Sequence, residues 1–203
     1  RRYLQKALSD DYNTIRTRNG EEALEVVKNR NIDLIISDIM MPIMDGCELC
    51  NRIKSDIEYS HIPVILLTAA IGTDTRIKTL EAGADAYIEK PFSMELLNAT
   101  IKNLFKSRES AYEQFKHSPL GFGGSPSGSN MDQRFMDKLN DCILEHISDP
   151  ELGIETLTEA MNVSKSTLYR KIKANTGLNT NEYIRLFRLK KAAEILAGQE
   201  HRI

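Results

Sequence analysis

The sequence predicts an α/β fold built on a doubly wound parallel sheet, followed by a smaller all-α region. Three short apolar runs are predicted strands: DLIISD at 33–38, PVILLTA at 63–69 and AYIEK at 86–90. Apolar residues recur at helical spacing between these runs, over 20–30, 46–56 and 74–82. Because strands that alternate with helices pair in parallel, we expect helices on both faces of the sheet.

A long helix is predicted over 93–117. It is amphipathic at its start through Leu96, Leu97, Ile101, Leu104 and Phe105. The next stretch, SPLGFGGSPSGSN at 118–130, is rich in Gly, Ser and Pro and is predicted to be a flexible linker. Its glycines lack the Lys-Ser/Thr ending of a phosphate-binding loop. Every later segment has a helical pattern, so we predict three parts: 1–117, the linker 118–130, and 131–203.

The composition is ordinary for a soluble protein of one large or two small domains, with 41% hydrophobic and 28% charged residues in 203. No run approaches the roughly 18 consecutive apolar residues that span a bilayer, and no secretory leader opens the sequence. We therefore expect a cytoplasmic location without membrane contact. Cys47, Cys50 and Cys142 are expected to be reduced thiols. Cys47 and Cys50 have the spacing of a redox pair, but we interpret them as packing residues.

The formal net charge of −2 hides an uneven distribution along the chain. Residues 131–159 contain two basic and eight acidic side chains, a net charge of −6. Residues 164–191 contain eight basic side chains and one acidic, a net charge of +7. A local basic block in a nearly neutral chain is typical of a surface that binds phosphate groups.

Polar residues interrupt the apolar pattern where the predicted strands end. Asp38 ends the first run, Thr68 lies near the end of the second, and Lys90 ends the third. In open parallel sheets, functional residues collect at the carboxyl ends of the strands. A carboxylate, a hydroxyl and an ammonium at one edge suit a phosphoryl group, as nucleophile, hydrogen-bond donor and counter-charge. Singly, Asp38 could be a turn cap and Lys90 a solvated strand end, but together they favour a phosphoryl site.

The first half of the chain resembles the response-regulator receiver family over about residues 1–116. The motifs that carry the resemblance are DLIISDIMMPIMDG at 33–46, PVILLTA at 63–69 and GADAYIEKPF at 83–92. The resemblance implies a flavodoxin-like fold in which a histidine kinase transfers phosphate to Asp38. It also implies a cis peptide bond between Lys90 and Pro91.

The same resemblance implies roles for the neighbours of Asp38. Thr68 would bond the phosphate oxygens and Lys90 would pair with them. Asp38 and the backbone carbonyl of Met40 would bind Mg²⁺, so the Met40 side chain need not be polar. Tyr87 would be the switch, an aromatic ring that turns inward when Thr68 moves toward the phosphate, although a half-buried packing role for Tyr87 is the alternative.

The sequence departs from the family at its start. The family opens with an apolar strand that ends in an acidic pair holding Mg²⁺, whereas this sequence begins at Arg1 within a predicted helix, RRYLQKAL. Asp10 and Asp11 follow that helix, in the wrong place to substitute for the pair. Our hypothesis is that the sequence is a fragment, or that its first strand is disordered, trimmed or swapped with a partner. We therefore expect Mg²⁺ binding to be weakened or absent, and the prediction of phosphorylation is firmer for the parent than for this chain.

The segment IETLTEAMNVSKSTLYRKI at 154–172 predicts two helices joined by a turn at Asn162 and Val163, with Ser164 capping the second. The side chains predicted to face the core are Leu157, Ala160, Met161, Leu168 and Ile172. This is the pattern of a helix-turn-helix. An ordinary helical hairpin with solvated lysines is the alternative, but the basic block coincides with the outward face of the second helix.

This segment resembles the AraC-type DNA-binding family over about 132–196. The resemblance implies double-stranded DNA as a partner. The residues that would face bases are Ser166, Tyr169 and Arg170, with Arg170 as the guanine reader. The residues that would mainly contact phosphates are Lys165, Lys171 and Lys173. Residues 181–196 would connect to a second motif, but the sequence stops at Ile203, so we expect weak DNA binding by this chain.

A receiver, a linker and an AraC-type segment, in this order, resemble the cytoplasmic end of hybrid two-component regulators, although a free-standing regulator fits equally. We predict a transcription regulator in which phosphate on Asp38 shifts the face around Tyr87, 74–82 and 86–90. This shift would favour a homodimer and so modulate DNA binding. Enzymatic activity beyond self-catalysed phosphorylation is left open, because the parent could carry a histidine kinase. One alternative is a helical half that binds protein. Another is a phosphohydrolase with Asp38 as nucleophile, which would need a carboxylate where Met40 stands.

Overall fold

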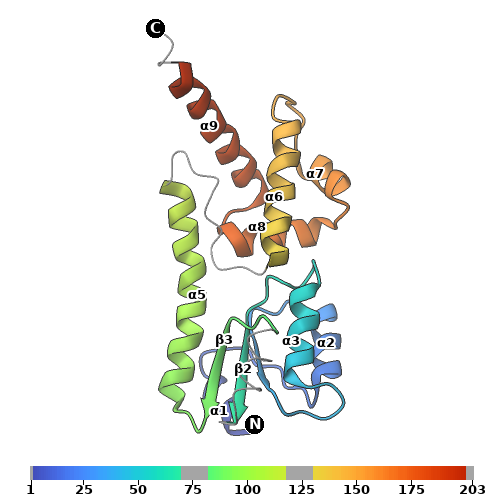
Figure 1. Cartoon of the computed structure of the whole chain (residues 1–203), viewed down its shortest axis with the longest axis vertical. Coiled ribbons are helices and arrows are strands. Elements are labelled where there is room, and N and C mark those ends of the chain that lie inside the picture. The colour runs from blue at the N-terminus through green and yellow to red at the C-terminus, as the bar shows by residue number, and fades with distance from the viewer. Residues whose placement is uncertain (1, 70–81, 118–129, 200–203) are drawn as a thin grey trace. The chain divides into compact units, whose positions relative to one another are not determined.

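The computed structural model describes residues 2–69, 82–117 and 130–199, and the side chains within 4–69, 82–106 and 130–196 (Figure 1). The chain divides into two compact units, Arg1–Leu104 and Phe105–Ile203, which are described separately. The predicted linker at 118–130 lies outside the described residues except for its last position. No helix in the described part of the chain is both long and apolar enough to cross a membrane.

The first unit contains the predicted alternation of helices and strands. Its elements are α1 (Arg2–Leu8), α2 (Gly20–Asn29), β1 (Ile35–Asp38), α3 (Gly46–Ser55), β2 (Val64–Ala69), β3 (Ala86–Lys90) and the start of α5 (Met94–His117). These bounds confirm the predicted strands and helices to within two residues. The helix predicted at 74–82 falls almost entirely at 70–81, outside the described residues.

The three strands form one parallel sheet in the order β1-β2-β3. Figure 1 shows α2 and α3 on one side of this sheet and α5 on the other. Val64 and Leu66 are buried in a core with side chains of α2 and α3. Ile65 and Leu67 alternate with them and are also buried, so they point to the opposite face. Burial of both faces explains why the β2 sequence is continuously apolar.

On α5, the predicted inward face is partly confirmed. Leu97 and Ile101 are buried and lie four residues apart, which places them on the same side of the helix. The prediction that Leu96 is also inward is wrong, because its side chain is largely exposed. Leu96 is rotated from Leu97 by about 100° around the helix axis, enough to move it off a narrow buried stripe.

A buried network holds the amino ends of β2 and β3. The Lys54 Nζ of α3 lies 2.7 Å from Asp85 Oδ2 and donates to the Ile62 carbonyl at 2.9 Å. Asp85 Oδ2 also accepts the Val64 N–H at 2.8 Å. The buried Lys54 ammonium is therefore satisfied, as a buried charge must be to avoid a large desolvation cost. Its partner, the Asp85 carboxylate, is partly exposed. The network fixes α3 against the starts of two neighbouring strands.

The second unit is helical throughout its described part after α5. Its elements are α6 (Asn130–Glu145), α7 (Ile154–Met161), α8 (Lys165–Thr176) and α9 (Thr180–Gln199). α7 ends at Asn162, which has a left-handed conformation with φ 54°, as helix ends often do. Ser164 then caps α8, its Oγ accepting the Thr167 N–H at 3.1 Å. The predicted turn and cap between α7 and α8 are confirmed.

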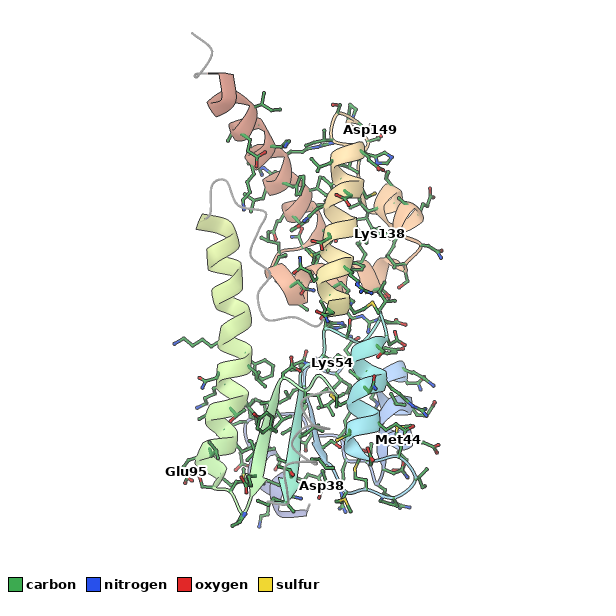
Figure 2. All side chains as sticks on the ribbon, viewed as in Figure 1. Asp38, Met44, Lys54, Glu95, Lys138 and Asp149 are labelled. Carbon is green, nitrogen blue, oxygen red and sulfur yellow. The ribbon has the colours of Figure 1, made fainter. Side chains whose placement is uncertain are left out.

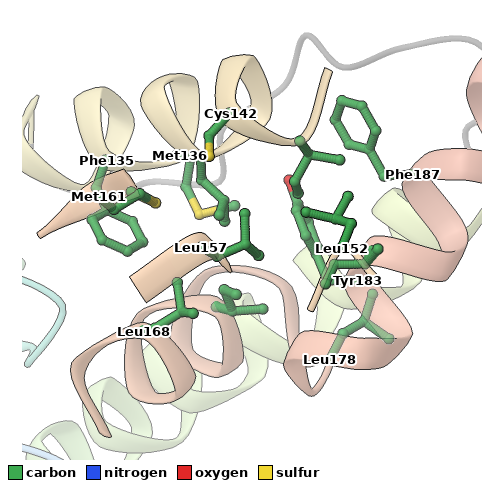
Figure 3. Packing of buried hydrophobic residues seen from close by; sticks show 14 residues of the cluster. Phe135, Met136, Cys142, Leu152, Leu157, Met161, Leu168, Leu178, Tyr183 and Phe187 are labelled. Atoms are coloured by element: carbon green, nitrogen blue, oxygen red, sulfur yellow. The ribbon is translucent and has the colours of Figure 1, made fainter. Parts of the chain in front are cut away.

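A single apolar core joins these helices (Figure 3). Leu157 and Met161 of α7 and Leu168 and Ile172 of α8 are buried in it, as predicted. The prediction that Ala160 is also inward is wrong, because Ala160 is exposed. The small Ala160 side chain gives up little apolar burial by facing solvent, whereas Leu157 and Met161 already form the inward side of α7.

Asp132 and Lys171 form an ion pair inside this unit. Lys171 Nζ lies 2.5 Å from Asp132 Oδ1, with side-chain exposures of 0% and 4%. The same ammonium lies 5.5 Å from the centre of the Phe135 ring, within range of a cation–π contact. The pair joins the first turn of α6 to the middle of α8 and therefore fixes the position of α8 in the unit.

We expect Asp132→Asn to lower the free energy of unfolding of the helical unit by about 3–5 kcal/mol, because it removes the carboxylate that faces a buried ammonium. Replacing both partners by apolar residues, Asp132→Leu with Lys171→Met, is expected to restore the stability fully. Urea unfolding followed by circular dichroism measures both. Asp137→Asn on the exposed side of α6 is the control. Equal urea midpoints for Asp132→Asn and the control would show that the pair does not matter.

Candidate functional site

The structure brings Asp38 and Lys90 together. Asp38 is the last residue of β1 and Lys90 the last of β3, so both lie at the carboxyl edge of the sheet. Lys90 Nζ donates to Asp38 Oδ2 at 2.6 Å, and the two side chains are 36% and 24% exposed. Figure 2 shows Asp38 at the opposite end of the sheet from Lys54. A carboxylate that reaches solvent beside an ammonium is accessible to an incoming phosphoryl group.

Thr68 lies on the same edge. It is the second-last residue of β2, the strand between β1 and β3, and it pairs with Glu89. Its Oγ1 donates to the carbonyl of Ala69 at 3.0 Å, so the hydroxyl is engaged by its own strand end. Thr68 is partly exposed. The three predicted residues therefore share one edge, and the direct contact is between Asp38 and Lys90.

The loop between β1 and α3 contacts Asp38 at both of its ends. The N–H of Met40 donates to Asp38 Oδ1 at 3.4 Å, while the Met40 side chain is 79% exposed. Gly46 begins α3 directly beside Asp38, and a Cβ atom there would lie 2.3 Å from the Asp38 carbonyl oxygen. Only glycine permits this approach. The signal for Gly46 in the sequence was a glycine directly after a helix-capping aspartate, Asp45.

Two further features lie on β3 and directly after it. The Lys90–Pro91 peptide bond is cis, as predicted. Tyr87 of β3 is 43% exposed, on the face opposite the buried Ile88.

A second candidate surface is the outward side of α8. Its exposed or partly exposed residues include all five predicted to be outward, Lys165, Ser166, Tyr169, Arg170 and Lys173. They recur at helical spacing, so they form one stripe along the helix. Lys173 Nζ also donates to the carbonyl of Gly177 at 2.7 Å, near the carboxyl end of the helix.

The prediction that Lys171 contacts phosphate is wrong. Lys171 is fully buried and paired with Asp132, on the side of α8 that also carries Leu168 and Ile172. Three and four residues separate Lys171 from Leu168 and from the buried Thr167, which puts all of them on one face. The basic block is therefore divided between a surface stripe and a structural cation.

A parallel sheet with helices on both faces and a polar pair at its carboxyl edge defines the class of flavodoxin-like α/β domains. The family model of the response regulator receiver domain matches residues 1–102, and the chain belongs to that family. A solved relative is the signal receiver domain of a signal transduction histidine kinase from Syntrophus aciditrophicus. It shares 39% sequence identity with this chain, and the match covers 52% of this chain and 80% of that one, with a TM-score of 0.50.

Curated relatives include histidine kinases and response regulators. Histidine kinase P4 of Formosa agariphila is 35% identical over 194 residues, which cover 96% of this chain and 14% of that protein. The polar-differentiation response regulator DivK of Brucella anthropi is 45% identical over 94 residues, covering 45% of this chain and 75% of that protein. The chain spans only a small part of the kinases that it matches.

Receiver domains take phosphoryl groups from histidine kinases and typically bind Mg²⁺ at the phosphorylation site. Mg²⁺ needs octahedral oxygen ligands, commonly one or two carboxylates with water and phosphate oxygens. Within the described residues, no three His, Cys, Asp or Glu side chains gather closely enough to hold a metal. At the edge itself, Asp38 contributes one carboxylate, already paired with Lys90. The described side chains alone fit Mg²⁺ poorly, and weakened Mg²⁺ binding stays a prediction.

The cysteines agree with the packing interpretation. Cys47, Cys50 and Cys142 are free thiols. The Cys50 Sγ donates to the carbonyl of Ala82 at 3.2 Å, and burial raises the pKa of this thiol to about 12. A thiol that stays protonated at neutral pH is a poor redox nucleophile.

In the native protein, we therefore expect iodoacetamide at about pH 8 to leave Cys50 unmodified, because the reactive thiolate forms only as pH approaches the raised pKa. Peptide mass spectrometry after alkylation measures this. The same treatment in urea, where burial is lost, is the control and should label all three cysteines. Equal labelling rates for Cys50 in the native and unfolded protein would contradict the assignment.

Proposed function

We propose that the chain is the receiver and output part of a two-component transcription regulator, with Asp38 as the phosphoacceptor. The observation that carries this proposal is the Asp38–Lys90 pair, at 2.6 Å, on the carboxyl edge of a receiver-family sheet. Asp38 is a nucleophile that solvent reaches, and Lys90 supplies a positive charge for the incoming phosphate. Thr68 is one residue beyond the level of Asp38 on the neighbouring strand, where its hydroxyl can turn toward a phosphate oxygen.

The proposed response to phosphate runs through β3. When Thr68 turns toward the phosphate, it leaves space on its own side of the sheet edge. Tyr87 is half-exposed, so it can turn inward into that space. The changed face around Tyr87 and 86–90 then favours pairing of two receivers. Pairing places two output segments on one DNA site and raises their effective concentration without new base contacts.

The proposed output is DNA binding through α7 and α8 as a helix-turn-helix. Two short helices joined by a three-residue turn, with a basic stripe along the second, support this proposal. In a helix-turn-helix the second helix enters the major groove. Ser166, Tyr169 and Arg170 would face bases, and Lys165 and Lys173 would contact phosphates. The similarity to Histidine kinase P4 extends over both units, which supports a hybrid parent protein that joins kinase, receiver and output.

Treatment of the chain with acetyl phosphate and Mg²⁺ is expected to add one phosphoryl group, because Asp38 is accessible and faces a cation. The addition should be slow, since the described side chains fit Mg²⁺ poorly. Intact mass spectrometry measures the addition. Asp38→Asn is the control and should gain none. Phosphorylation of the control to the same extent would show that Asp38 is not the phosphoacceptor.

The pairing step is tested by analytical ultracentrifugation of the phosphorylated chain. Self-association equal to that of the unphosphorylated chain would contradict it.

We expect the chain to bind a random-sequence DNA duplex with an affinity that falls steeply as salt increases, because bound lysines release counterions from the phosphates. Lys173→Ala should reduce the slope of log K against log salt by about 0.9, the contribution of one phosphate contact. Fluorescence anisotropy of a labelled duplex measures the slope. Lys138→Ala, which removes an exposed lysine from α6, is the matched control. A salt-independent affinity would favour a protein partner for the helical unit.

A further inference from the structure

An acidic residue of α7 contacts the first lysine of the basic stripe. Glu155 is the second residue of α7 and Lys165 is the first residue of α8. Lys165 Nζ lies 2.5 Å from Glu155 Oε1, across the turn that joins the helices. Both side chains are on the surface, 71% exposed for Glu155 and 65% for Lys165. The contact with Lys165 lowers the pKa of the Glu155 carboxyl, so Glu155 is charged at neutral pH.

The position of Lys165 makes this contact relevant to phosphate binding. The first turn of α8 contains no acidic side chain, and the amino end of a helix favours a negative charge. The carboxylate that contacts the first residue of α8 is that of Glu155, from the neighbouring helix. A DNA phosphate that approached Lys165 would meet a neutral pair instead of a cation. Lys165 must therefore release Glu155, or share its ammonium, before it contributes fully to phosphate binding.

We propose that Glu155 is an affinity-setting residue, which competes with DNA phosphate for Lys165. This inference rests on the DNA-binding function proposed above. Non-specific affinity comes almost entirely from phosphate contacts, whereas base contacts provide discrimination. A carboxylate that offsets one phosphate-binding lysine therefore weakens binding to all sequences alike. It leaves the base-facing residues Ser166, Tyr169 and Arg170 unchanged.

The expected size of the effect follows from the exposure of the pair. Ion pairs in solvent are weak, so removing the Glu155 charge should tighten DNA binding by about two- to fivefold at low salt. The slope of log K against log salt should become steeper by at most about 0.9, because one more lysine then displaces counterions. Both changes should disappear when Lys165 is absent.

The experiment compares four forms of the full chain, the wild type, Glu155→Gln, Lys165→Ala and the double variant, in binding to a random-sequence duplex over a series of salt concentrations. Glu159→Gln is the matched control, because it removes the same charge from the same helix one turn away. Circular dichroism checks that each variant is folded. We expect tighter and more salt-dependent binding for Glu155→Gln alone, and no effect of this substitution in the Lys165→Ala background.

Two results would overturn the inference. One is an affinity for Glu155→Gln equal to that of Glu159→Gln, because the effect would then be that of net charge and not of the contact. The other is the same gain in the Lys165→Ala background, because Glu155 would then act without Lys165. If the wild type shows no salt-dependent DNA binding, the proposed function itself is wrong. That result is distinguishable, because it does not depend on position 155.

Discussion

The parallel pairing of β1, β2 and β3 is the constraint on which the receiver unit depends. Asp38 and Lys90 are 52 residues apart in sequence, yet they touch because their strands flank β2 and end at one edge. At the amino ends of β2 and β3, Lys54 and Asp85 pair with each other, and Asp85 also accepts a backbone N–H. The sheet thus separates a structural ion pair at its amino edge from an accessible one at its carboxyl edge.

In the helical unit, helix periodicity determines which lysines of α8 are buried and which are exposed. Along α8, positions three and four residues apart share a face, so Lys171 points into the core while Lys165 and Lys173 point to solvent. The surface of the helix is therefore less basic than its composition implies. The remaining surface charge is further reduced by Glu155, which belongs to a different helix. What a phosphate group meets is set by tertiary contacts as much as by the number of lysines.

Local patterns predicted the elements well, and they predicted less about partners across the fold. Apolar periodicity was sufficient for β1–β3, α2, α3 and the α7–α8 pair, and strand ends were sufficient to bring Asp38 and Lys90 together. The burial of Lys171 was missed because a lysine in a basic run is ordinarily solvated, and its partner lies 39 residues away. The Glu155–Lys165 contact was missed because Glu155 was counted in the acidic stretch 131–159 and Lys165 in the basic stretch 164–191.

The Asp132–Lys171 pair also limits which substitutions are tolerated at positions 132 and 171. Since a buried charge without its partner is costly, while an apolar pair of similar volume is tolerated, neither position can change freely alone. Among relatives, positions 132 and 171 should therefore covary. A chain with an apolar residue at one of them should have an apolar residue at the other. Such covariation would distinguish a lysine that holds this helix in place from the lysines available to nucleic acid.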